Sequence, residues 1–156
     1  MCGPAVAMIG NALGTYTQIK AAKENTAYQV SVAKANAALA EHQAVAAGQT
    51  GTYEQSQIRE KARQIAGTQK AQISASGLDI SAGSPLSILS DTAYQSEQDV
   101  QMSRYNTGMR MWELNSQARS YREQAAAAKS AGKYATQSLL LTGLTSLGKQ
   151  YKSFKD

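Results

Sequence analysis

Residues 75–85 are the one strong interruption in a sequence that otherwise favours helix. Gly77 suits the left-handed backbone position that commonly ends a helix. Ser84 followed by Pro85 is a typical helix start, because serine caps the first amides and proline suits the first helical position. The pattern therefore predicts a turn over residues 77–84 between two helices. The residues that we expect to shape this turn are Gly77, Asp79, Gly83, Ser84 and Pro85.

The stretches on either side of the turn, residues 15–76 and 85–129, are rich in alanine. Alanine has the highest helix propensity but buries little area. Hydrophobic residues make up 42% of the 156, yet there is only one Trp and one Phe. We therefore expect an all-α protein, an elongated antiparallel helical hairpin with a thin core. Association into an oligomer would supply the burial that one copy lacks.

Apolar and small residues at steps of three and four mark the face that each arm is expected to bury. In the first arm they are Ile58, Ala62, Ile65, Gln69 and Ile73. In the second arm they are Leu89, Ala93, Ser96, Val100, Ser103 and Thr107. Residues 48–52 contain two glycines and are either a break or a weak point in a continuous helix. Residues 130–132 predict a second break.

The two ends of the chain carry short apolar stripes. Residues 1–14 form a small apolar segment, and residues 133–154 are predicted as a separate amphipathic helix. Neither approaches the roughly 20 apolar residues of a bilayer-spanning helix. We expect these ends to contact each other, a partner protein or a membrane surface. The candidate contact residues are Val6, Ile9, Leu13, Leu140, Leu144, Leu147, Tyr151 and Phe154.

The sequence contains no recognisable set of catalytic or metal-binding residues. His42 is the single histidine, and neither a second histidine nor a cysteine is placed to share a metal with it. Cys2 has no histidine partner at an informative spacing. Glu97 and Asp99 are two residues apart, so on a helix they do not face each other. We expect no enzymatic activity, no cofactor and no metal.

The net charge of +5 is spread along the chain rather than gathered in a basic tract. Such a surface tolerates non-specific contact with DNA, but the pattern favours a solvated helix face over a DNA-binding surface. The densest basic group consists of Arg59, Lys61 and Arg63. If the protein binds DNA, binding should depend steeply on salt and should weaken when these three residues are replaced.

The stretch from Gly67 to Pro85, GTQKAQISASGLDISAGSP, is followed by LSILSDTA and then by Glu97–Asp99, Arg104–Asn106 and Trp112. This pattern resembles the internal virion proteins of tailed bacteriophages, also called virion core or ejection proteins. The match is to the small member found in short-tailed phages. The resemblance covers most of the chain and is best over about residues 60–125.

The resemblance implies a protein that is packaged in the capsid near the portal and leaves the particle ahead of the genome. It also implies a channel at the host outer membrane, with copies of the chain, the portal and other internal virion proteins as partners. Outer-membrane lipid and phage DNA are further contacts that the resemblance allows. An alternative is a helical adaptor or scaffold that stays in the virion, and a helical DNA-associated protein is another.

Overall fold

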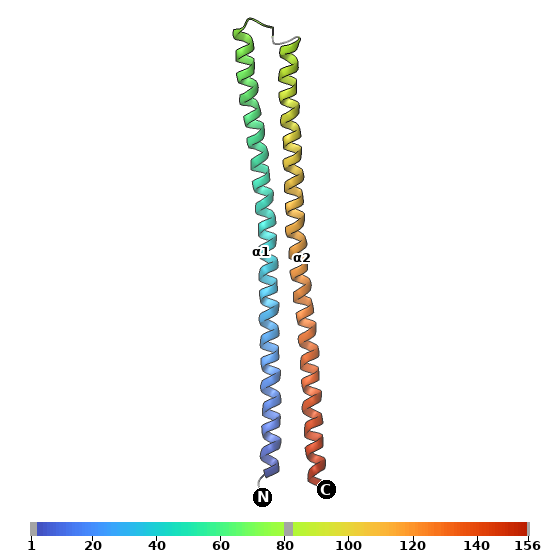
Figure 1. Ribbon diagram of the computed structural model, residues 1–156. Helices are drawn as coiled ribbons and strands as arrows, with labels where there is room; N and C mark the ends of the chain where they lie inside the picture. The colour runs from blue at the N-terminus through green and yellow to red at the C-terminus, as the bar shows by residue number, and fades with distance from the viewer. Residues whose placement is uncertain (1–2, 80–82, 156) are drawn as a thin grey trace. The chain divides into compact units, whose positions relative to one another are not determined.

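The computed structural model describes residues 3–79 and 83–155, and in this part of the chain it contains two helices and no strand. Helix α1 spans Gly3–Ala75 and helix α2 spans Ser84–Lys155 (Figure 1). The all-α class and the two long packed helices are therefore as expected. The side chains of residues 3–9, 150–151 and 153–155 are not described.

The end of α1 has the hydrogen bonds of a Schellman motif. The amide of Leu78 donates to the carbonyl of Ile73 at 3.4 Å, and the amide of Gly77 donates to the carbonyl of Ser74 at 3.1 Å. Gly77 has a φ of 72°, a left-handed conformation that a side chain disfavours. The predicted helix end near Ser76 is confirmed, because the backbone turns where glycine permits it.

Helix α2 begins one residue before the predicted Pro85. The amide of Ser87 donates to the carbonyl of Gly83 at 3.3 Å, so Gly83, with a φ of 71°, precedes the first helical residue. Ser84 is therefore already inside the helix rather than its cap. Asp79 lies outside both helices, and the remaining turn residues, 80–82, fall outside the described part of the chain.

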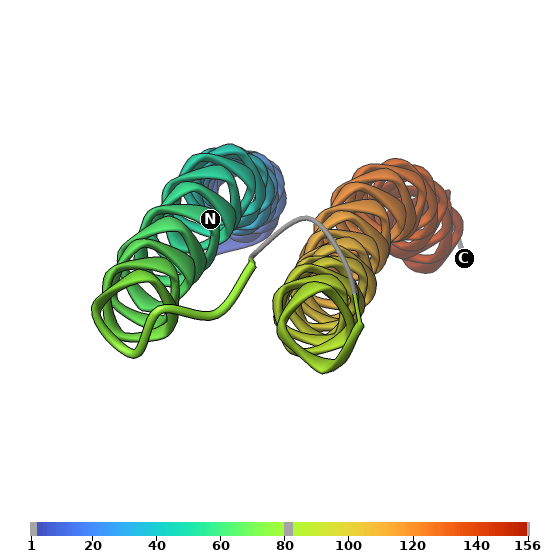
Figure 2. The ribbon, with the colours of Figure 1, turned by 90° about the horizontal axis from the view of Figure 1, so that it is seen from above.

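The chain divides into two compact units. The terminal unit comprises residues 1–39 and 117–156, and the loop unit comprises residues 40–116. In each unit a segment of α1 lies beside a segment of α2, and the two segments run in opposite directions (Figures 1 and 2).

Both helices are continuous where breaks were considered. Residues 48–52 are helical, and so are residues 130–132, where a break was predicted. The apolar ends are accordingly parts of α1 and α2 rather than separate short helices. The glycines at these positions serve packing instead: a Cβ on Gly51 would overlap Thr107, and a Cβ on Gly132 would overlap Thr26.

These glycine–threonine contacts fix the register of each unit. In the terminal unit Thr15 faces Gly143 and Thr26 faces Gly132, so the same 11-residue step separates the contacts on both helices. An 11-residue step is 3.67 residues per turn, close to the 3.6 of a straight α-helix. The two segments can therefore stay in contact over this length with little supercoiling.

Among the described residues, the fully or nearly buried side chains of the seam are small. In the part of the chain whose side chains are described, the buried hydrophobic residues are Ala33, Ala37, Ala40, Ala44, Val100, Ala118 and Ala125, and Val100 is fully buried. The accessible surface is 11516 Å². A typical folded monomer of this mass, 16.6 kDa, exposes about 7,600 Å². The thin core that the alanine content predicted is confirmed.

At two positions the buried residue is the sequence neighbour of the residue that was predicted to be buried. Ile65 is exposed, and Ala66 takes the position in the seam; Ala93 is exposed, and Thr92 takes its place. At the first position the smaller residue, Ala66, allows the two helices to approach closely. At the second position the helix period places Thr92 in the seam, although Ala93 is the smaller residue. The other predicted stripe residues from 58 to 73 and from 89 to 107 are at least partly buried.

Candidate functional site

Among the described residues, no group of three His, Cys, Asp or Glu side chains is placed to hold a metal ion. His42 is exposed on α1, and Cys2 falls outside the described part of the chain. Within residues 3–79 and 83–155, neither helix contains a stretch apolar enough over its length to span a bilayer. The features that remain are surfaces.

The first surface is an exposed apolar cluster in the terminal unit, which we call the leucine patch. Its members are Tyr16 from α1 with Leu140 and Leu144 from α2, which line one groove. Leu140 is 51% exposed and Leu144 is 65% exposed. Exposed leucines gathered in one area are unusual on a soluble surface and indicate a contact with protein or lipid.

The close contact between Thr15 and Gly143 explains why these leucines are exposed. Gly143 is buried against Thr15 and occupies the seam. Leu140 lies about one turn before Gly143 and Leu144 directly after it, so both leucines flank the seam instead of filling it. The flanking side chains border an open groove of about 240 Å³. Its lining residues are Ala12, Thr15, Tyr16, Ile19, Leu140, Gly143, Leu144 and Leu147.

The groove brings together three of the predicted contact residues, Leu140, Leu144 and Leu147, whereas Leu13 is exposed on α1 and does not line it. Leu147 is partly buried, whereas Leu140 and Leu144 are exposed. The remaining four predicted residues are Val6, Ile9, Tyr151 and Phe154. Their backbones belong to α1 or α2, and their side chains lie outside the described residues.

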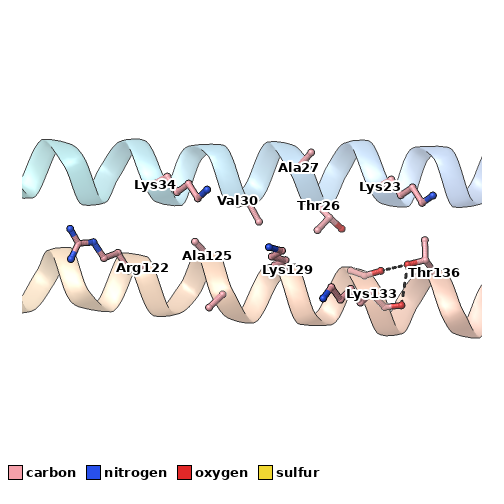
Figure 3. A pocket seen from close by; sticks show the side chains of 12 residues that line it. Lys23, Thr26, Ala27, Val30, Lys34, Arg122, Ala125, Lys129, Lys133 and Thr136 are labelled. Atoms are coloured by element: carbon pink, nitrogen blue, oxygen red, sulfur yellow. Dashed lines mark hydrogen bonds between the residues drawn. The ribbon is translucent and has the colours of Figure 1, made fainter.

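The second surface is an open groove of about 620 Å³ between α1 and α2 of the terminal unit, which we call the basic groove (Figure 3). Its floor contains Ala27, Val30, Ala125 and Ala126. Its basic residues are Lys23, Lys34, Arg122, Lys129 and Lys133, and no acidic residue lines it. Figure 3 shows Thr26 and Val30 reaching from α1 toward α2.

Sequence reasoning identified Lys23 and Lys34 only as part of a dispersed charge. The signal that could have found the groove is spacing: Lys23 and Lys34 are 11 residues apart on α1, and Arg122 and Lys133 are 11 apart on α2. Since the seam of this unit repeats with the same step, both pairs stay beside it. Their convergence also requires the antiparallel register.

The basic group of the loop unit is partly neutralised within the chain. The Nη2 atom of Arg59 lies 3.4 Å from Oε1 of Glu97 on α2. The Nη2 atom of Arg63 lies 2.6 Å from Oε2 of Glu60, one turn earlier on α1. Lys61 lines a groove that also contains Asp99. Carboxylates beside these cations reduce the local attraction for a phosphate backbone, which weakens the case for a DNA site here.

The model of the T7 virus internal virion protein gp14 family matches residues 1–155 of the chain. No curated protein and no solved structure matches.

Proposed function

Since this chain belongs to the T7 virus internal virion protein gp14 family, and is therefore a structural protein inside a bacteriophage particle, we propose that it is released into the host envelope during infection. There it helps to form the channel through which the genome passes. Inside the particle it is located near the portal, in contact with the portal and with other internal virion proteins.

The first support for this proposal is the amount of apolar surface that one copy leaves exposed. Large side chains such as Trp112, Met109 and Tyr105 lie on the surface of the loop unit, while the seam holds mostly alanine. A chain that buries so little on its own gains stability by packing against neighbours. Assembly of several copies is therefore part of the proposed function.

The observation that carries the channel proposal is the leucine patch. Tyr16, Leu140 and Leu144 expose apolar area at an apolar groove in the unit that contains both chain ends. Several copies arranged side by side would place several such patches together, which provides an apolar surface larger than that of one helix. Such a surface suits the hydrocarbon region of a membrane.

Vesicle leakage tests the membrane step directly. The protein is added to dye-filled vesicles of bacterial lipids, and the Leu140→Asp/Leu144→Asp variant is compared with wild type. We expect wild type to release dye and the variant to release much less, because two carboxylates oppose burial in lipid. A matched control is Leu39→Asp, which changes an exposed leucine of the same unit outside the patch. Leakage lost equally in the control would contradict a specific role for the patch.

Mass spectrometry of virions tests the release step. Purified particles are compared before and after genome release is triggered. We expect the chain in full particles and its loss from emptied ones. If the chain remains in emptied particles and vesicles stay sealed, it is a retained helical adaptor, and the proposal is wrong.

A further inference from the structure

The basic groove is a built feature of the terminal unit that the proposed channel does not use. Four lysines, Lys23, Lys34, Lys129 and Lys133, surround an apolar floor, and all four are exposed. In the described part of the chain none of them forms an ion pair with a carboxylate. Like charges held close together without partners raise the free energy of one copy, and an acidic occupant would relieve this repulsion.

The charge of the chain is distributed unequally between the two units. The terminal unit contains ten Lys or Arg residues and three Asp or Glu residues, whereas the loop unit contains six and eight. The terminal unit is therefore strongly positive and the loop unit mildly negative. This difference in charge favours contact between the terminal unit of one copy and the loop unit of another.

One segment of α2 in the loop unit contains acidic residues but no basic ones. From residue 84 to residue 103 there is no Lys or Arg, and Asp91, Glu97 and Asp99 lie in this segment. Ile88, Asp91, Asp99 and Met102 follow helical spacing and share one side of α2. Ile88 is 47% exposed and Met102 is 61% exposed. We call these four residues the acidic side of α2.

The charged residues of the two surfaces extend over comparable lengths of helix. Lys23 and Lys34 are 11 residues apart, or about 16 Å along a helix, and Asp91 and Asp99 are eight apart, or about 12 Å. The alanines of the groove floor allow a third helix to approach closely, and Ile88 and Met102 would cover that floor. A DNA backbone would meet the lysines but leave Val30 and the alanines uncovered.

We propose that the basic groove binds the acidic side of α2 from a second copy of the chain, so that the terminal unit of one copy packs against the loop unit of the next. The contact is heterologous, since the two surfaces differ. Repetition of such a contact generates a closed ring when the rotation closes and a filament when it does not. This inference rests on the proposed function only for the premise that copies assemble.

A charge exchange tests the proposal in solution, in the absence of lipid. The groove variant is Lys23→Glu/Lys133→Glu, and the acidic-side variant is Asp91→Lys/Asp99→Lys. Sedimentation equilibrium at low salt should show that each variant alone self-associates at least about ten-fold more weakly than wild type. An equimolar mixture should recover association, because each reversed surface then meets its complement. Wild-type association should also weaken as salt rises.

The matched control is Lys149→Glu/Lys152→Glu, which makes the same change of charge on the terminal unit outside the groove. It should associate more strongly than the groove variant. Circular dichroism verifies that each variant is helical, and Lys34→Glu/Lys129→Glu is a second groove variant if the first does not fold. The salt titration of wild type needs no variant.

Three results would overturn the proposal: a wild type that stays monomeric, a mixture as weak as its components, or a groove variant that associates normally but no longer binds a DNA duplex or anionic vesicles. The last result would assign the groove to another occupant. The two proposals can fail separately. If association is restored in the mixture but the wild type releases no dye from vesicles, this inference stands and the membrane step of the proposed function is wrong.

Discussion

Gly51 of α1 lies directly against the side chain of Thr107 of α2 in the loop unit, and a Cβ on Gly51 would come within 2.8 Å of the Thr107 Cβ. The hydroxyl of Thr107 donates to the carbonyl of Ser103 at 2.7 Å, which holds the side chain in place. The same pairing recurs in the terminal unit, where Gly132 faces Thr26. Glycine at these positions lets two helices approach more closely than alanine would allow.

The first prediction concerns this contact. Gly51→Ala should lower the free energy of unfolding, because overpacking costs about 1–3 kcal/mol and exceeds the gain in helix propensity of about 1 kcal/mol. Gly67→Ala is the control, since a Cβ there meets no atom within 4 Å. It should stabilise the protein by up to about 1 kcal/mol. Urea unfolding followed by circular dichroism measures both. Equal effects of the two substitutions would contradict the close packing at Gly51.

The second prediction concerns Val100, the one fully buried side chain of the described core. Val100→Ala removes two methylene equivalents from the seam of the loop unit and leaves a cavity. It should lower the free energy of unfolding by about 2 kcal/mol. Val45→Ala, in the same unit, changes a side chain that is 58% exposed. It should change the free energy of unfolding, measured by urea unfolding, by less than about 0.5 kcal/mol.

The third prediction concerns Ser103, whose Oγ is buried without a hydrogen-bond partner. An unpaired buried hydroxyl costs roughly 1 kcal/mol or more, so Ser103→Ala should stabilise the protein. Alanine also has the higher helix propensity, and Ser56→Ala corrects for this. The Ser56 hydroxyl is exposed and donates to the carbonyl of Tyr53 at 2.7 Å. Thermal unfolding should show a larger gain for Ser103→Ala, and a loss of stability would refute the assignment.

The fourth prediction concerns Gly77, whose φ of 72° ends α1. Gly77→Ala should destabilise the protein by about 1–2 kcal/mol, because a Cβ disfavours the left-handed conformation. Gly77→Asn should cost less, since asparagine tolerates that conformation. Urea unfolding measures both variants. A smaller cost for Gly77→Asn than for Gly77→Ala would show that the cost arises from backbone strain in the left-handed conformation. Equal costs would argue against a left-handed residue here.

Much of the fold follows from local properties of the sequence. The alanine-rich arms predict two long helices, and Gly77 and Pro85 locate the turn between them to within a residue or so at each helix end. The predicted separate C-terminal helix is instead part of α2. Gly132 indicates a helix break as long as its neighbour across the seam, Thr26, is unknown. Local propensity treats a glycine in a helix as a cost, whereas packing makes it a contact.

The candidate site was predictable in part. The stripe of Leu140, Leu144 and Leu147 indicated a contact surface, and the structure places Leu140 and Leu144 on the surface beside the seam. The basic groove was not predictable in the same way. Lys34 and Arg122 are far apart in the sequence, and only the antiparallel register brings them to one groove.

The sequence by itself determined that this chain is helical, where it turns and how little it can bury, because helix propensity, turn geometry and side-chain size are properties of single residues and their near neighbours. Only the tertiary structure decided which residues form the seam. Thr15 meets Gly143 and Thr26 meets Gly132 because two helices in van der Waals contact fit at one register. That register leaves Leu140 and Leu144 exposed and gathers the lysines, and neither result can be obtained from one helix alone.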